Sequence, residues 1–208
     1  MKIAIIGTGS VGSALGQGFV KAGHEVVFGV RDAGKPKVAE VVQATGARAD
    51  AVDAAVAGAE VVVLAMPWGA TQEVIEAAGG LAGKIVFDCI NPLKPDLSGL
   101  DTGGARSAAE QIAAWAPGAR VVKVFNSTGA GNMADPHYGG SGATMLYCGD
   151  DTGAKQVAAS LAADLGFEPV DAGGLAAAYL LEHQAMLWIH LAYGVGMGRN
   201  IAFKLLRR

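Results

Sequence analysis

The sequence predicts an α/β protein, with a doubly wound, mainly parallel sheet followed by an apolar C-terminal helix. An apolar run, Lys2 to Ile6, leads into a glycine-rich turn, a helix over Ser13 to Ala22 and a second strand over Glu25 to Phe28. Further along, short apolar runs alternate with helical segments. One of these runs, Glu60 to Ala65, is apolar after its first residue, as is typical of parallel strands covered on both faces. This order indicates a Rossmann-type sheet with right-handed crossovers.

The glycine-rich turn, Gly7-Thr8-Gly9-Ser10-Val11-Gly12, has the G-x-G-x-x-G spacing of dinucleotide-binding proteins. Gly7 allows the tight turn, Gly9 lets a pyrophosphate approach the backbone, and Gly12 lets helix and strand pack closely. The following helix offers free N–H groups and the positive end of its dipole to phosphates. Because strand, turn, helix and strand follow in that order, we expect a dinucleotide site here rather than a turn that binds nothing.

The end of the second predicted strand indicates which dinucleotide binds. NAD sites place an acidic residue there to bond the ribose 2′-hydroxyl, but this chain has Gly29 at that position and Arg31 close behind it. A guanidinium suits a 2′-phosphate, and Lys35 and Lys37 add positive charge. Asp32 is either a late acidic ligand or a turn residue. We therefore expect NADP rather than NAD.

The remaining elements alternate in the same manner. Two long loops interrupt them, Asn91 to Gly104 and Asn126 to Gly142. The predicted helices are Lys37–Thr45, Ala51–Ala57, Thr71–Ala78, Ser107–Trp115 and Thr152–Leu165, and the predicted strands are Glu60–Ala65, Lys84–Asp88, Arg120–Phe125, Thr144–Cys148 and Phe167–Val170.

Composition fits one domain, or one domain with a short appendage, and excludes several classes of function. The 208 residues are 51% hydrophobic and 17% charged, with a formal net charge of −3. No basic stripe supports nucleic-acid binding, and the longest apolar stretch, Ala185 to Met197, is too short for a membrane span. Cys89 and Cys148 lie outside any C-x-x-C pattern, so we expect reduced thiols in a cytoplasmic protein.

Ligands of doubly wound sheets bind where the strands end, and three such ends carry small, polar or flat residues. Trp68 is either a cover for a planar ring or a plug behind its loop. Asn91 and Asn126 either bond a carboxamide or carbonyl or tie down their own turns. No acid–base pair occurs among these residues, so no catalytic side chain is assigned. The three ends are Met66-Pro67-Trp68, Cys89-Ile90-Asn91-Pro92 and Asn126-Ser127-Thr128-Gly129.

Metal chemistry finds no support in the sequence. His183 and His190 lie seven residues apart on one predicted helix, but no ligand at i+4 joins them, so no metal site is predicted. His137 is either a proton donor near the crevice or a solvated loop residue. We expect Glu110 and Glu182 to be helix-surface or packing residues.

The chain after residue 172 differs from the rest. We divide the chain into a dinucleotide-binding domain, 1–172, and a C-terminal helical segment, 173–208. Leu175 to Tyr193 is a strongly apolar predicted helix that needs a second apolar surface, either a second copy of the chain or its own nucleotide domain. Arg199 to Arg208 would place basic residues at a helix C-terminus, where the dipole favours them.

The chain resembles the NADP-dependent coenzyme F420 oxidoreductases, and the nucleotide half of that family also resembles the cytoplasmic domain of six-transmembrane ferric reductases. The similarity extends over nearly the whole length. It departs from the family at Val30, often a serine, and at Asn126, a histidine in archaeal F420 enzymes. The matching stretches are Gly7–Gly12, Gly23–Gly29 with Arg31, Pro67-Trp68, Asn91-Pro92, Arg106–Glu110, Cys148–Asp151, and Asp171–Gly173 with Leu175 and Glu182.

The resemblance implies hydride transfer between the nicotinamide of NADP(H) and a stacked acceptor ring such as coenzyme F420. Such chemistry needs alignment and water exclusion more than acid–base side chains. Asn126, Ser127 and Trp68 are the predicted acceptor contacts. The predicted cofactor contacts are Gly7, Thr8, Gly9, Ser10, Val11, Gly12, Arg31, Lys35, Met66, Pro67, Trp68, Asn91, Pro92, Asn126 and Ala130.

Three alternatives remain open at this stage. An imine or pyrroline-carboxylate reductase shares the opening fingerprint but carries a longer helical domain after it. A reductase that passes hydride to a flavin, a quinone or ferric iron fits the same pocket. A redox sensor would bind NADP(H) without turning it over.

Overall fold

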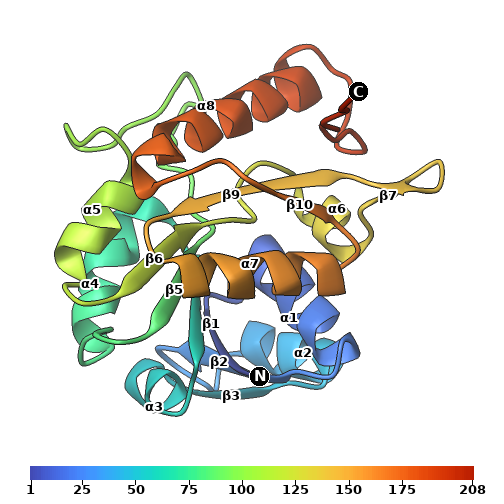
Figure 1. The fold of residues 1–208 in the computed structure, drawn as a ribbon. Coiled ribbons are helices and arrows are strands. Elements are labelled where there is room, and N and C mark those ends of the chain that lie inside the picture. Colours follow the sequence, from blue (N-terminus) through green and yellow to red (C-terminus); the bar gives the residue numbers. More distant parts are fainter.

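The computed structural model describes residues 1–208, and its centre is an eight-stranded sheet with helices on both faces (Figure 1). The strand order is β10-β9-β6-β5-β4-β1-β2-β3. All neighbours pair in parallel except β6 and β9, which are antiparallel, so the predicted fold class is confirmed. The strands of this sheet are β1 (Lys2–Ile6), β2 (Glu25–Val30), β3 (Arg48–Ala51), β4 (Val61–Leu64), β5 (Ile85–Asp88), β6 (Arg120–Lys123), β9 (Thr144–Gly149) and β10 (Glu168–Asp171).

Two apolar cores lie on the two faces of the sheet, because successive side chains of a strand point in opposite directions. Ile3 and Ile5 of β1 belong to one core, with helices α1, α2, α6 and α7. Ala4 and Ile6 belong to the other, with α3, α4, α5 and α8. The helices are α1 (Ser10–Lys21), α2 (Pro36–Thr45), α3 (Val52–Ala57), α4 (Thr71–Ala77), α5 (Ala108–Trp115), α6 (Ala130–Ala134), α7 (Thr152–Asp164) and α8 (Ala178–Ile189), with 3-10 turns η1 (Trp68–Ala70) and η2 (Leu175–Ala177) and a π-helical turn η3 (His190–Gly194).

Three short elements were absent from the prediction. Strand β3 has the sequence Arg-Ala-Asp-Ala and lies at the sheet edge, so it shows no apolar run. Helix α6 and the hairpin of β7 (His137–Tyr138) with β8 (Ser141–Gly142) lie inside the predicted loop from Asn126 to Gly142. Each has five residues or fewer, which is too short for a periodic signal.

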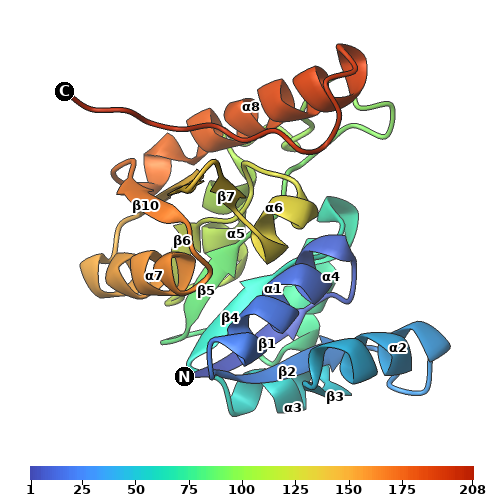
Figure 2. The same cartoon turned by 90° about the vertical axis from the view of Figure 1, so that its right-hand side faces the viewer.

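The prediction of basic residues at a helix C-terminus is wrong. The last helical turn ends at Gly194, and Gly196 and Gly198 follow with φ of 81° and 79°, in the left-handed region that stops a helix. The chain then continues as an extended tail beneath α8 (Figure 2).

The extended tail hydrogen-bonds to the start of β9, the part of β9 that does not pair with β6. Strand β6 contacts only Cys148 and Gly149 of β9, and the free start of β9 bonds the tail instead. The amide of Thr144 donates to the carbonyl of Phe203 at 3.0 Å, and the amide of Leu205 donates to Thr144 Oγ1 at 2.9 Å. The tail is therefore hydrogen-bonded to the start of β9 and is not a helix end. None of the helices combines the length and the apolar character that a membrane span requires.

Candidate active site

The glycine-rich turn places α1 directly against the sheet. Gly7 has a φ of +120°, and a Cβ atom there would lie 2.2 Å from the carbonyl oxygen of Ala65, the residue that follows the neighbouring strand β4. A Cβ at Gly12 would lie 2.0 Å from the carbonyl oxygen of Gly7. Both positions therefore exclude any larger residue for reasons of packing alone.

Gly9 differs from these two glycines. A Cβ at Gly9 would meet no atom within 4 Å, so the space beside it is open. Gly9 is also the N-cap of α1, without a side-chain cap bond, and the first turn of α1 contains no acidic residue. The free N–H groups of the helix start thus face open space, the arrangement in which helices bind phosphate.

A cavity of about 260 Å³ lies on one side of the turn, at the carboxyl end of β2. It brings together six of the predicted cofactor residues, and two of them, Arg31 and Lys35, are cations. Neither cation forms an ion pair within the protein. The six residues are Gly7, Thr8, Arg31, Lys35, Met66 and Pro67.

Two further residues of this cavity, Gly29 and Asp32, bear on which dinucleotide it suits, and Asp32 is its one acidic lining residue. Gly29 carries no side chain at the position where NAD sites carry an acidic residue, and a Cβ there would lie 2.4 Å from Cδ1 of Ile6, so an acidic residue would require the Ile6 side chain to move. Asp32 Oδ1 accepts a hydrogen bond from the amide of Gly34 at 2.9 Å, which is the turn role among the two alternatives for this residue.

A second cavity, of about 400 Å³, lies on the other side of the turn. Six predicted residues line it, and α8 and the tail supply the opposite wall. The packing of α8 on its own nucleotide domain was one of the two alternatives for the apolar helix, but the sequence identified none of the residues of this wall, because nothing local in the chain indicates where α8 packs. The predicted residues are Ser10, Val11, Asn91, Asn126, Ser127 and Ala130, and the others include Leu93, Leu97, Trp188, Ile189, Tyr193 and Arg199.

Trp68 and Pro92 lie outside both cavities. The ring of Trp68 stacks on that of Trp115, with centroids 5.1 Å apart and an interplanar angle of 26°. Trp68 therefore packs against α5, as expected for a plug behind its loop. Pro92 is buried in its own loop.

Asn91 and Asn126 bind each other. Asn91 Nδ2 donates to the main-chain oxygen of Asn126 at 2.8 Å, and Asn126 Nδ2 donates to Asn91 Oδ1 at 3.0 Å and to the carbonyl of Leu181 at 3.0 Å. Asn126 Oδ1 is buried and has no hydrogen-bond partner. Phe125, next to it, has a φ of 59°, a strained conformation for a non-glycine residue that a functional site can exploit. The pair thus joins two loops to α8 and leaves one acceptor atom unsatisfied.

Beneath this pair lies a fully buried ionic cluster. Lys123 Nζ at the end of β6 lies 2.8 Å from Asp88 Oδ2 and 2.9 Å from Glu182 Oε1, and all three side chains have no exposed surface. Asp88 Oδ1 accepts the amide hydrogen of Ile90 at 2.9 Å, and Lys123 donates to the carbonyl of Ile90. The cluster therefore holds the peptide on both sides of Ile90 and, with it, the start of the Asn91 loop.

Charge and burial shift the pKa values within the cluster. Burial opposes the ammonium charge, but the two carboxylates outweigh it and raise the pKa of Lys123 above its usual value. Burial also raises the pKa of Glu182, more than the neighbouring lysine lowers it. Of the two alternatives for Glu182, the helix surface is wrong: the side chain is buried, and its ion pair with Lys123 ties α8 to the sheet.

None of the three histidines considered in the sequence lines either cavity beside the glycine turn, although His137 lines a separate cavity between α1, α6 and α7. His137 is exposed and 2.9 Å from Asp135, and His183 and His190 are exposed on α8 and η3. No group of three potential metal ligands comes together.

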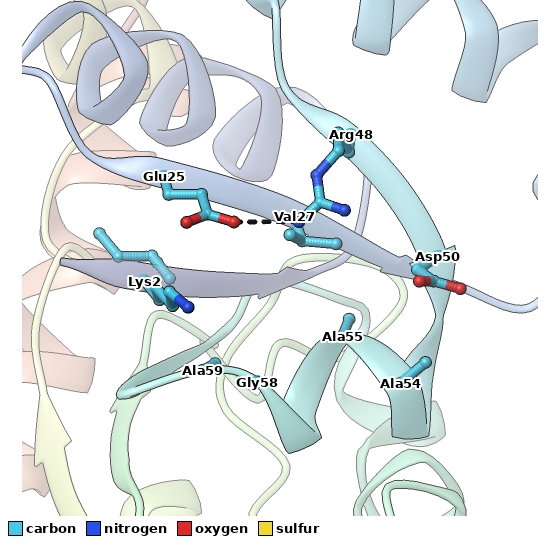
Figure 3. Close-up of a pocket in the computed structure, with 10 residues that line it drawn as sticks. Lys2, Glu25, Val27, Arg48, Asp50, Ala54, Ala55, Gly58 and Ala59 are labelled. Carbon is cyan, nitrogen blue, oxygen red and sulfur yellow. Dashed lines mark hydrogen bonds and ion pairs between the residues drawn. The ribbon is translucent and has the colours of Figure 1, made fainter.

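A third cavity, of about 190 Å³, lies at the amino-terminal ends of β1, β2 and β3 (Figure 3). Glu25 and Arg48 form a 3.0 Å ion pair across it, and both side chains are largely exposed. Doubly wound sheets bind ligands at the opposite edge, so we assign no ligand to this cavity.

Comparison with known proteins identifies relatives of the chain in sequence and in fold. The family model described as NADP oxidoreductase coenzyme F420-dependent matches residues 2–92. The F420-dependent NADP reductase of Methanothermobacter marburgensis is 31% identical over 208 aligned residues, covering 92% of this chain and 92% of that protein. The crystal structure of a putative F420-dependent NADP reductase from Arthrobacter sp. FB24 is 33% identical, with a TM-score of 0.90 over 100% of both chains.

A further relative is much longer than this chain. Metalloreductase STEAP3 of Rattus norvegicus is 32% identical over 182 residues, which cover 87% of this chain and 36% of that protein. The chain therefore spans only about a third of this metalloreductase.

Proposed function

Because this chain belongs to the F420-dependent NADP oxidoreductase family and is an NADP-dependent oxidoreductase, we propose that it transfers a hydride between NADP(H) and coenzyme F420. The observation that carries the proposal is the placement of two cavities on either side of the glycine turn. Gly7 and Thr8 line the cavity with Arg31, whereas Ser10 and Val11 line the cavity with the asparagine pair. A dinucleotide that crosses the turn would place its adenosine end in the first cavity and its nicotinamide end in the second.

The residues present fit NADP. Arg31 and Lys35 are unpaired cations suited to the 2′-phosphate, and the open start of α1 beside Gly9 is suited to the pyrophosphate. When bound, NADPH supplies the hydride at nicotinamide C4. We propose Met66, Pro67 and Ala130 as further contacts. Trp68 and Pro92 are not among the proposed contacts because they lie outside both cavities.

The protein's own contribution is alignment and exclusion of water. Asn126 presents an unpaired buried oxygen, and Ser127 and Asn91 lie beside it. Trp188 and Ile189 supply an apolar wall against which a planar acceptor ring can lie. Hydride transfer between two stacked rings needs no proton-transfer residue, so the proposed mechanism assigns none.

We also propose a homodimer through α8. Its inner face caps the sheet through Glu182, and its outer face exposes Leu180 and Leu187, seven residues apart, with Tyr193 beyond them. An unpartnered apolar stripe of this kind fits a second copy of the same helix. In this proposal residues 1–172 bind the dinucleotide and 173–208 cap and dimerise. The free thiols Cys89 and Cys148 support a reducing, cytoplasmic location.

The test is an acceptor screen in which NADPH oxidation is followed by absorbance. Coenzyme F420, FMN, FAD, quinones and ferric chelates are offered in turn, and F420 reduction in a one-to-one ratio with NADPH oxidation is the expected result. Turnover with ferric iron alone would replace F420 reduction by the metal reduction that the name of the metalloreductase relative indicates. Turnover with a flavin or a quinone alone would identify that compound as the acceptor instead of F420. Tight NADPH binding without consumption by any acceptor would indicate a redox sensor.

A further inference from the structure

The acceptor cavity contains a single charged side chain. The 400 Å³ cavity is lined by asparagine, serine, threonine, small residues and apolar side chains, with Arg199 as the exception. No carboxylate of the protein pairs with Arg199. Arg199 is exposed where it lines this cavity, so its guanidinium is available to an anionic ligand that enters there.

The position of Arg199 is specified by the backbone on both sides. Before it, the left-handed Gly198 donates its amide hydrogen to the carbonyl of Ala192 at 3.1 Å. After it, the carbonyl of Ile201 accepts from Trp188 Nε1 and from Asn132 Nδ2, both at 2.7 Å. Arg199 thus lies between two fixed points of the tail and is held at the cavity.

The rest of the cavity suits a flat apolar group. The ring of Trp188 lies so close to Gly129 that a Cβ there would be 2.6 Å from it. Leu93 and Leu97 of the long loop and Ile189 of α8 add apolar surface. A ligand that satisfies both features has a planar ring and an acidic substituent.

The nucleotide's own adenosine phosphate has cations elsewhere. Arg31 and Lys35 line the other cavity, and the open helix start at Gly9 lies between the two cavities. Arg199, the cation of the acceptor cavity, is therefore not needed by the phosphates of the nucleotide and is available to the acceptor.

We propose that Arg199 binds an anionic substituent, a phosphate or carboxylate, of the ring-bearing acceptor. The proposal rests on the proposed function, since it assigns the second cavity to the acceptor. Arg199 then determines acceptor specificity by charge, while the apolar wall and the asparagine pair position the ring.

The experiment compares one ring with and without the anion. 5-Deazariboflavin and its 5′-phosphate share a hydride-accepting ring, and each is offered to the enzyme with saturating NADPH. We expect the KM of the phosphate ester to be lower by about tenfold, the contribution of a charged hydrogen bond, with a smaller preference at high salt. Arg199→Gln abolishes the preference, so that the KM values of the two rings agree within about twofold, and Arg199→Lys retains part of it. Arg207→Gln, in the same tail but outside the cavity lining, is the matched control and keeps the preference.

Two results would overturn the proposal. One is an undiminished preference for the phosphate ester in Arg199→Gln. The other is a KM for NADPH that rises equally with both rings, because Arg199 would then serve the nucleotide. If neither ring is reduced, the proposed function fails separately, and deazaflavin fluorescence titrations of the same variants still decide whether Arg199 discriminates the two rings.

Discussion

Lys123 and Glu182 form a 2.9 Å ion pair between the end of β6 and the middle of α8, and neither side chain has any exposed surface. Asp88 approaches the same ammonium group at 2.8 Å. The pair fastens the C-terminal helix to the sheet directly below the Asn91–Asn126 contact. Burying such a cluster is costly, but removing one partner is costlier, because it leaves uncompensated charge in the interior.

Replacing the lysine should therefore destabilise the protein strongly. We expect Lys123→Met to lower the free energy of unfolding by about 3–5 kcal/mol, measured by urea denaturation. Lys155→Met is the control, because Lys155 forms a 2.9 Å pair with a half-exposed Asp171. That variant should lose about 1 kcal/mol or less. Equal losses of unfolding free energy in the two variants would show that the buried cluster contributes no more to stability than an exposed ion pair.

Two glycines of the same turn should respond in opposite ways. Gly12→Ala places a Cβ 2.0 Å from the carbonyl of Gly7, so it should lower thermal stability by roughly 1–3 kcal/mol. Gly9→Val meets no protein atom at its Cβ, so it should lower stability by about 1 kcal/mol or less, the effect of a poorer N-cap, while NADPH and NADH binding are both lost. Calorimetry and fluorescence titration separate the two effects. If Gly9→Val still binds NADPH, the assignment of the pyrophosphate to this turn is wrong.

Coenzyme preference should depend on Arg31. We expect Arg31→Ala to raise the KM of NADPH by about 10- to 100-fold, the value of a charged contact, and that of NADH by less than about threefold. Lys37→Ala is the control, since Lys37 does not line the cavity that holds Arg31. An equal rise for both coenzymes would contradict the assignment of the 2′-phosphate to this guanidinium.

The buried thiols should make stability fall in alkali. Burial raises the pKa of Cys148 to about 12 and that of Cys89 well above its usual value. An unfolded thiol loses its proton near pH 8.5, so above about pH 9 the unfolded state binds fewer protons than the folded one, and rising pH favours unfolding. Each thiol contributes a slope of up to about 1.4 kcal/mol per pH unit.

Cys148→Ala tests this slope in urea unfolding at several pH values. The variant should lose stability less steeply than the unaltered protein between pH 9 and 11, whereas the difference between them should be constant from pH 6 to 8. Parallel curves up to pH 11 would mean that the folded thiol ionises as readily as the unfolded one.

The exposed leucines of α8 provide a test of the proposed dimer. Leu187→Glu places a charge in the centre of the apolar stripe, and we expect the mass in multi-angle light scattering to fall to that of one chain. Leu206→Glu, at the exposed end of the tail, should leave the mass unchanged. A single-chain mass for the unaltered protein, or a two-chain mass for Leu187→Glu, would rule out dimerisation through this face.

The features predicted from the sequence are those that depend on neighbouring residues. The strand–turn–helix unit at Gly7 to Gly12 and the apolar strand of β4 carry their pattern within a few positions. Strand β3 was missed because an edge strand with polar residues has no apolar run. The turn at Gly196 and Gly198 was missed because an apolar helix pattern continues up to it.

The candidate site was only half predictable for the same reason. Arg31 and Lys35 follow the fingerprint along the chain, so their place in the cavity could be inferred. Glu182 and Arg199 reach the site from the far end of the chain, through the packing of α8 and the tail. A single sequence holds no local mark of such contacts. Trp68 is the opposite case. Its place at the end of a strand suggested a ligand contact, but its ring stacks on Trp115 and lines neither cavity.

The two cavities draw on nearly separate lengths of chain. Residues 6–74 line the one with Arg31, whereas residues 91–199, with Ser10 and Val11, line the one with Arg199. Substitutions that change the preference for the coenzyme contact almost none of the residues contacted by substitutions that change the preference for the acceptor. The free-energy effects of the two kinds of substitution should therefore add. Coenzyme preference and acceptor preference could therefore be optimised in separate variant libraries, and the selected substitutions could be combined in one protein.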